Sequence, residues 1–231
     1  MLRLENLELS YPRFHLTADW SAKSGEVIAV IGPSGAGKSS LLMAIAGFIN
    51  PDKGRILWQG LDIAPLPPAH RPVSILFQDQ NLFPHLTIAQ NLGLALAPDL
   101  RLSAAQITRV SGVFDRLGLA GLGHRRPADL SGGQQGRAAL GRVLLQARPI
   151  LLLDEPFAAL GPALKSDLLA QVRDLAAETA ALVLLVTHDP RDAQRFADRT
   201  VLVADGTAQA PAPTAGLFTN PPPALRDYLG R

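Results

Sequence analysis

The chain has 231 residues, of which 47% are hydrophobic and 18% are charged, a composition that suits a soluble globular protein and excludes general disorder. No apolar run approaches the roughly 18 residues of a membrane-spanning helix, and the lack of cysteine excludes disulfides, thiolate metal sites and cysteine nucleophiles. The 22 basic and 20 acidic residues give a net charge of only +2, so no nucleic-acid partner is expected. Because no secretory signal is recognisable, we expect a cytoplasmic location.

Two segments near the start have the patterns of strands. Residues 2–10 are rich in strand formers, and the larger apolar side chains of residues 14–20 alternate strictly with the others. A Ser-Gly-Glu turn follows at residues 24–26. We expect two antiparallel strands at one edge of a sheet.

Four unbroken apolar runs predict strands that are buried on both faces. They cover residues 27–31, 73–77, 150–153 and 182–186. Such strands belong to parallel sheets that are covered by helices on both sides. A helix predicted over residues 162–178, with its apolar side chains on one face, covers the sheet between the last two runs. The pattern predicts an α/β fold.

Helices dominate the stretch from about residue 84 to residue 148. The pattern Ser/Thr-x-x-Gln, typical of a helix N-terminus, begins there at Thr87, Ser103 and Ser131. We therefore predict a single domain over residues 1–231, with this stretch as a helical subdomain inserted in the core. After Gly206 the chain is rich in proline, and its end predicts a short docking helix with the apolar residues Ala224, Leu225, Tyr228 and Leu229.

The first buried run leads directly into a glycine-rich loop, G-x4-G-K-S, and then into a helix. This is the context of a phosphate-binding loop, in which bare backbone amides and a helix N-terminus surround an anion. Lys38 would neutralise the β and γ phosphates, and Ser39 would hold Mg²⁺. We predict that the nucleotide contacts Gly32, Pro33, Ser34, Gly35, Ala36, Gly37, Lys38, Ser39 and Ser40.

Two acids end the third buried run, and a histidine follows the fourth. In a doubly wound sheet the carboxyl ends of the strands face the ligand, so Asp154 can reach a Mg²⁺ ion and Glu155 an attacking water. His188 should reach the same crevice. The alternative is a charged strand end that merely faces solvent.

The segment L-S-G-G-Q at residues 130–134 is the most specific in the chain. Ser131 and Gln134 could simply cap a helix. Capping, however, does not require Gly132 and Gly133, which cost roughly 1 kcal/mol each relative to alanine within a helix. Bare amides beside a hydroxyl at a helix N-terminus make a second anion site. The chain therefore carries two half-sites for phosphate.

Taken in this order, these segments resemble the ATP-binding subunits of ABC transporters, a P-loop NTPase family, over essentially the whole chain. The resemblance implies a head-to-tail homodimer in which residues 131–134 of one copy clasp ATP on the other. It also implies that Glu155 is the catalytic base, His188 the switch histidine, Gln78 a sensor of metal and partner, and Tyr11 the aromatic residue that stacks on adenine. Packing at a strand end is the other interpretation of Tyr11.

The same resemblance implies the partners and the location of the chain. ATP and Mg²⁺ are the expected cofactors, and transmembrane permease subunits are the direct partners. A periplasmic or extracellular solute-binding protein takes part only indirectly, and the subunit lies peripherally on the cytoplasmic face of the inner membrane. The apolar residues that we expect near the permease are Leu82, Phe83, Leu86 and Ile88, although a place in the core is the alternative.

Three glycines depart from the family pattern. Gly161 stands where the family usually has an acid that crosses the dimer interface, and Gly136 and Gly141 are additional glycines after the L-S-G-G-Q segment. Glycine offers no charge and adds backbone freedom. We therefore expect weak dimerisation of the isolated subunit and slow hydrolysis.

Within the family, residues 46–48, 67–78 and 81–91 are most similar to the ATP-binding subunit of bacterial thiamine importers. Importers of iron, sulfate or polyamines share much of this pattern and remain alternatives. A soluble ABC-type ATPase of DNA repair or translation would need two fused ATP domains or a long coiled coil. A P-loop kinase would have no use for residues 130–134.

Overall fold

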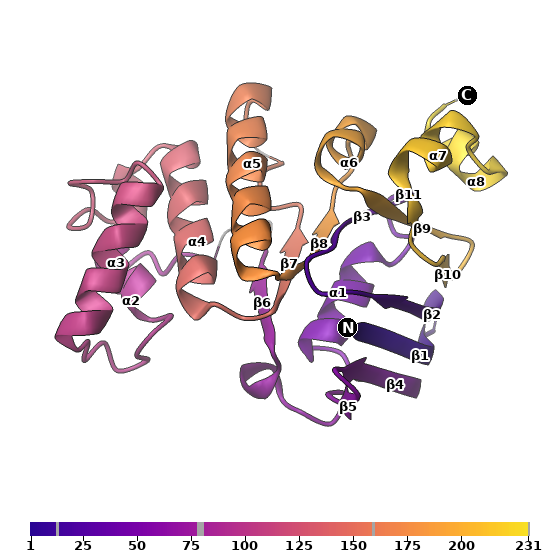
Figure 1. The fold of residues 1–231 in the computed structure, drawn as a ribbon, viewed down its shortest axis with the longest axis horizontal. Coiled ribbons are helices and arrows are strands. Elements are labelled where there is room, and N and C mark those ends of the chain that lie inside the picture. Colours follow the sequence, from indigo (N-terminus) through magenta and orange to yellow (C-terminus); the bar gives the residue numbers. More distant parts are fainter. Residues whose placement is uncertain (13, 78–80, 159, 231) are drawn as a thin grey trace.

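The computed structural model describes residues 1–12, 14–77, 81–158 and 160–230. The centre of the sheet is parallel and has the order β9-β3-β8-β7-β6 (Figure 1). The four predicted buried strands are present as β3 (Val27–Ile31), β6 (Val73–Leu76), β7 (Ile150–Asp154) and β8 (Leu182–Val186). Strand β9 (Arg199–Ala204), which pairs in parallel with β3, was not predicted.

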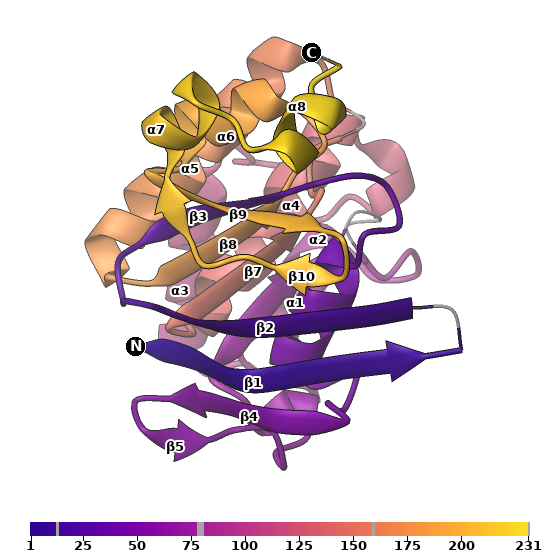
Figure 2. The same cartoon turned by 90° about the vertical axis from the view of Figure 1, so that its right-hand side faces the viewer.

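An antiparallel edge extends this sheet, and Figure 2 faces it. The predicted hairpin is confirmed, because β1 (Leu2–Tyr11) pairs antiparallel with β2 (Phe14–Ala22). On its other side β1 pairs with β4 (Lys53–Trp58), which in turn pairs with β5 (Leu61–Asp62). The short β10 (Thr207–Ala208) joins β2 to β9, and β11 (Ala212–Pro213) pairs with β9.

Helices follow several of these strands. The phosphate-loop helix is α1 (Lys38–Ala46), and the helices between β6 and β7 are α2 (Ile88–Gly93), α3 (Ala104–Arg116) and α4 (Gly132–Gln146). All three predicted capping boxes are formed, at the starts of α2, α3 and α4. The remaining helices are α5 (Pro162–Thr179), α6 (Pro190–Phe196), α7 (Thr214–Thr219) and the predicted docking helix α8 (Pro223–Tyr228).

The hydrophobic core lies on both faces of the parallel strands. Side chains of β3 alternate between two clusters, since Ala29 and Ile31 join one and Ile28 and Val30 the other. The first cluster also contains residues of α4, α5, α6 and α8, and the second contains α1 and the antiparallel edge. An unbroken apolar strand is therefore required here, as the sequence predicts.

Gly141 of α4 has a packing role. A Cβ atom there would lie 3.1 Å from side-chain atoms of Leu117 and Val113. The additional glycine thus lets α3 and the turn after it approach α4 closely. The absence of a side chain, and not backbone flexibility alone, explains why a glycine occupies this position of the helix.

A buried arginine fixes the end of α1 to the segment before β6. Arg71 is 1% exposed and donates hydrogen bonds to the carbonyls of Ala44 and Ile45, at 2.7 and 3.0 Å, and to those of Ala64 and Leu66, at 2.7 and 2.8 Å. A cation at a helix C-terminus also opposes the negative end of the helix dipole. The phosphate-loop helix and β6 are thereby held together.

Within the described parts of the chain, no helix combines the length and apolar character needed to cross a membrane.

Candidate active site

The glycine-rich loop at residues 32–37 connects β3 to α1, and its shape depends on two of its glycines. Gly32 has φ 150°, and a Cβ atom there would lie 2.0 Å from the carbonyl oxygen of Val203. Gly37 has φ 104°, and its Cβ would lie 2.5 Å from Cζ of Phe14. Both the neighbouring strands and the backbone conformation therefore exclude side chains at these positions.

The other predicted loop residues follow from this geometry. Pro33, Ser34 and Gly35 form an exposed tip, and Ala36 is half-buried. Lys38, Ser39 and Ser40 form the first turn of α1, where backbone amides have no helical partner. The helix N-terminus and the loop are thus arranged as an anion site requires.

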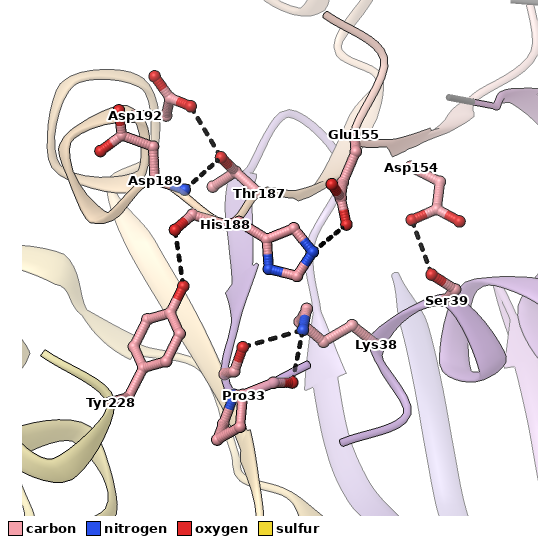
Figure 3. Close-up of polar contacts among 11 residues, drawn as sticks. Pro33, Lys38, Ser39, Asp154, Glu155, Thr187, His188, Asp189, Asp192 and Tyr228 are labelled. Carbon is pink, nitrogen blue, oxygen red and sulfur yellow. Dashed lines mark hydrogen bonds and ion pairs between the residues drawn. The ribbon is translucent and has the colours of Figure 1, made fainter. Parts of the chain in front are cut away.

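Lys38 is the central cation of this loop. It is 5% exposed, and its Nζ donates to the carbonyls of Gly32 and Pro33 at 2.9 and 2.8 Å (Figure 3). Burial lowers the pKa of Lys38, and the negative charges of Glu155 and Asp154 partly oppose this shift. A desolvated ammonium group at a loop of bare amides attracts an anion strongly.

Ser39 and Asp154 bring two oxygen ligands together. The Ser39 hydroxyl donates to Oδ1 of Asp154 at 3.0 Å, across 115 residues of sequence. Burial raises the pKa of Asp154, and the Ser39 hydrogen bond, Lys38 and His188 act against that rise. A hydroxyl and a carboxylate fit Mg²⁺, which usually takes few protein oxygens and completes its shell with water and phosphate. Among the described residues, no group of three His, Asp or Glu side chains that could hold a metal occurs.

Glu155 and His188 contact each other at the ends of neighbouring strands. Nε2 of His188 meets Oε1 of Glu155, and Figure 3 shows the imidazole between Glu155 and the tip of Lys38. Glu155 has φ 48°, an uncommon conformation for a non-glycine residue, and its backbone N–H donates to the carbonyl of Val186 at 3.2 Å. The sequence predicted that these residues share one crevice, because both follow strands of one parallel sheet.

A network that the sequence did not predict holds the loop around His188. The Thr187 hydroxyl donates to Asp192 at 2.7 Å and accepts from the backbone N–H of Asp189 at 3.1 Å. Lys165 of α5 forms an ion pair with Asp192. The loop is thereby fastened to α5 and α6. No local sequence motif predicts these contacts, because they depend on the packing of separate helices.

Another contact reaches the same loop from the C-terminal helix. The Tyr228 hydroxyl of α8 donates to the carbonyl of His188 at 2.8 Å. The sequence placed Tyr228 in an apolar docking patch and gave no sign that its hydroxyl reaches the site.

The L-S-G-G-Q segment opens α4. Gln134 N–H donates to the Ser131 hydroxyl at 3.3 Å, and Ser131 N–H donates to the Gln134 side chain at 3.0 Å. A Cβ atom at Gly133 would lie 2.1 Å from Cδ2 of Leu164, whereas one at Gly132 would make an ordinary contact. Gly133 therefore has a packing reason that sequence reasoning missed, while Ser131 and Gly132 are exposed.

Tyr11 lies at the end of β1 and is 49% exposed. Its ring centroid is 6.0 Å from that of Phe14, whose side chain lies against Gly37 of the phosphate loop. An aromatic pair thus stands beside the loop. The role of Tyr11 on adenine stays a prediction, and Gln78, predicted to sense metal and partner, lies outside the described residues.

The residues expected near a permease divide between core and surface. Ile88 is fully buried, so its expected exposure was wrong. Leu82 and Leu86 are half-buried, and Phe83 is 42% exposed. Ile88 is the first residue of α2 and faces the core cluster, whereas Phe83 lies in the preceding loop.

The phosphate loop, the paired acids and the histidine at the strand ends define a P-loop NTPase of the ABC type. The family model described as ABC transporter matches residues 17–158. The chain therefore belongs to the ABC transporter family.

Relatives with similar sequences extend over the whole chain. The chain is 66% identical over 230 residues to the Thiamine import ATP-binding protein ThiQ of Cereibacter sphaeroides, with 100% of both chains covered. It is 54% identical, again with 100% of both covered, to the protein of that name from Ruegeria sp.. The identity is 46% for the one from Yersinia pseudotuberculosis, with 94% of this chain and 92% of the relative covered.

Solved structures agree with this assignment. A dimeric post-hydrolysis ATP-binding cassette bound to ADP and Pi has a TM-score of 0.80 and 28% identity, covering 93% of this chain and 99% of its own. A nucleotide-free cassette from an ABC transporter has a TM-score of 0.82 and 26% identity, covering 96% of both chains. The predicted fold class is confirmed.

The raised pKa of Asp154 predicts an effect on stability. Above its usual value of 3.8 the unfolded chain loses the Asp154 proton more readily than the folded one, so this residue's contribution to stability falls as the pH rises through that window. Asp154→Asn should therefore raise the melting temperature of the nucleotide-free protein at pH 7, by roughly 2–4 °C for each kcal/mol gained. Calorimetry would check this, with Asp167→Asn, an exposed position on α5, as the control. A lower melting temperature for Asp154→Asn would contradict it.

Proposed function

We propose that this chain is the ATP-hydrolysing subunit of an ABC importer that takes up thiamine or its phosphates. The observation that carries the proposal is the meeting of Glu155 and His188 beside Lys38, which provides a base and a switch at a phosphate-binding loop. The names of the relatives support the cargo. In this arrangement the ATPase itself never touches the cargo.

The residues divide the work of hydrolysis among them. The amides of the loop and the Lys38 ammonium bind the β and γ phosphates. Ser39 and Asp154 would hold Mg²⁺, which would supply charge neutralisation on the phosphate oxygens. Glu155 orients and deprotonates the attacking water once its contact with His188 is released. The imidazole of His188 then turns toward the γ phosphate.

Two copies of the chain complete each ATP site. Ser131 and Gly132 are exposed at the N-terminus of the 15-residue helix α4, where free amides favour an anion. We propose that this segment, with Gly133 and Gln134, clasps ATP bound to the phosphate loop of the other copy. A head-to-tail homodimer therefore holds two nucleotides.

Transmembrane permease subunits are the proposed partners on the membrane side. A hollow of about 370 Å³ lies between α1, β6 and α4, with Phe48, Phe77 and Arg142 in its lining. Phe48 is 53% exposed, and its ring meets that of Phe77 edge-on at 5.8 Å. An exposed aromatic residue beside such a hollow suits a helix of a partner protein.

The loop at residues 82–87 follows Asn81, which lines this hollow, and has a fixed shape. Asn91, fully buried in α2, accepts a hydrogen bond from Phe83 N–H at 2.7 Å. Its amide donates to the carbonyls of Phe83, Leu86 and Thr87 at 3.0–3.2 Å. Arg142 lies 5.4 Å from the Phe83 ring centroid. A preformed loop lowers the entropic cost of binding a permease.

We place the subunit peripherally on the cytoplasmic face of the inner membrane, with the solute-binding protein meeting only the permease.

Glu155→Gln tests the activity and the cargo together. The amide keeps the shape of Glu155 but cannot accept a proton, so hydrolysis should fall by about 10²–10⁴-fold while ATP binding persists. Thiamine uptake in cells that depend on this chain should be lost as well. The measurements are phosphate release and labelled thiamine uptake, with Glu178→Gln as the control, an exposed acid that pairs with Arg116. Turnover by Glu155→Gln within a few-fold of the parent rate would show that Glu155 is not the base. If the parent protein supports uptake of another solute but not of thiamine, thiamine is rejected as the cargo.

Gly161→Asp tests the dimer. Gly161 is the N-cap residue of α5 with φ −62°, and a Cβ atom there meets nothing within 4 Å, so aspartate fits without strain. Restoring the acid of the family pattern should tighten the ATP-dependent dimer by about 1–3 kcal/mol through a charge-assisted hydrogen bond. Sedimentation with ATP, in a Glu155→Gln background, measures it. The same substitution at Gly112, exposed on α3 with equal space, is the control. Equal dimer constants would mean that other contacts already replace the acid.

Phe83→Glu tests the permease surface. The exposed ring contributes little to the core, so the variant should fold and bind ATP. A charge in the docking loop should reduce thiamine uptake by at least about tenfold, which corresponds to about 1.4 kcal/mol of binding free energy. Ile107→Glu is the matched control, because Ile107 is an apolar residue of α3 that is 57% exposed. Unchanged uptake by Phe83→Glu, or an equal loss with Ile107→Glu, would reject this surface.

A further inference from the structure

The C-terminal helix α8 places one polar atom at the hydrolysis site. The Tyr228 hydroxyl donates to the carbonyl oxygen of His188 at 2.8 Å, across 40 residues of sequence. Figure 3 shows the Tyr228 ring rising from α8 to the loop, on the far side of the His188 backbone from Glu155. The bond is made to the peptide of the proposed switch histidine itself.

Packing holds this tyrosine where its hydroxyl reaches the loop. Leu225, one turn earlier in α8, is fully buried in the core cluster, and Tyr228, Ala224 and Leu229 pack against the same cluster. Burial raises the pKa of the Tyr228 hydroxyl, and Asp189 and Glu155 raise it further. The hydroxyl therefore remains protonated at neutral pH and available as a donor.

The neighbours of His188 are held independently of Tyr228. Thr187 and Asp189 are linked by a hydroxyl-to-amide hydrogen bond, and the Asp189 side chain caps α6 by accepting from Arg191 N–H at 2.9 Å. These contacts fix the chain on both sides of His188. The peptide between His188 and Asp189 is therefore held on its N–H side by the Thr187 hydroxyl and on its carbonyl side by Tyr228.

We propose that Tyr228 is a positioning residue for His188. By fixing the His188 carbonyl, it gives the imidazole a stationary backbone, so the ring turns between Glu155 and a bound γ phosphate without movement of the loop. The assignment deepens the proposed ATPase function and rests on it. It makes the C-terminal segment part of the hydrolysis machinery.

The test compares Tyr228→Phe with Thr219→Val in the full-length protein. Thr219, in the neighbouring helix α7, also makes a 2.8 Å hydroxyl-to-carbonyl bond, to Ala215, and is therefore a matched control away from the site. Tyr228→Phe removes the hydroxyl and keeps the ring. We expect kcat for ATP hydrolysis to fall about three- to tenfold, the worth of one ordinary hydrogen bond, with KM for ATP within about twofold. Thr219→Val should change neither.

A second readout does not depend on turnover. Hydrogen exchange of the nucleotide-free protein, followed in peptides that contain residues 187–192, reports opening of the loop. Tyr228→Phe should accelerate exchange there about three- to tenfold, while Thr219→Val leaves it at the parental rate.

The outcomes separate the two proposals. Parental kcat and parental exchange in Tyr228→Phe overturn the positioning role, as does an equal change in Thr219→Val. Faster exchange with parental kcat overturns it too, because the loop would then loosen without consequence for the chemistry. If the parent protein hydrolyses no ATP, the proposed function fails, and the exchange result alone decides whether Tyr228 fixes the loop.

Discussion

The burial of the Lys38 ammonium is the constraint on which the rest of the site depends. A buried charge is stable only with close partners, and here these are two carbonyls of its own loop and the negative charges of Glu155 and Asp154. Those acids lie at the end of β7, which is separated from β3 by β8 alone. The parallel sheet, buried on both faces, is what brings the three strand ends to one edge. Without nucleotide, the negative charges of the two acids partly offset the positive charge of Lys38. In the proposed ATP complex a phosphate would be the main anion beside the lysine.

The sequence predicts best what short-range patterns determine. The unbroken apolar runs identified the central strands, and the Ser/Thr-x-x-Gln patterns identified the starts of α2, α3 and α4, because both signals are complete within a few residues. Strand β9 was not predicted because its place beside β3 follows from the pairing of distant segments. Ile88 was expected near the surface because an apolar residue looks the same in sequence whether it faces a partner or the core.

The same limit applies within the site. Lys38, Ser39, Asp154, Glu155 and His188 belong to motifs at strand ends, so the sequence could predict that they gather. Tyr228, Lys165 and Asp192 reach the loop around His188 from three different helices, and nothing near them in sequence indicates it. A side chain that supports a site through tertiary packing carries no local signal, although it restricts the movement of the residue that does the chemistry.

Helix α5 connects the two halves of the composite site. It begins just after the segment that follows Glu155, and the side chain of its residue Leu164 lies against Gly133, where a Cβ atom would come within 2.1 Å of Cδ2. Gly161 caps this helix without a side-chain hydrogen bond. Pro162 follows at the first position of the helix, where proline favours helix initiation. Because the Leu164 side chain of α5 packs against Gly133, a displacement of α5 would affect the packing of the L-S-G-G-Q segment. In the proposed dimer, α5 would therefore lie between the base for one ATP and the segment that clasps the other.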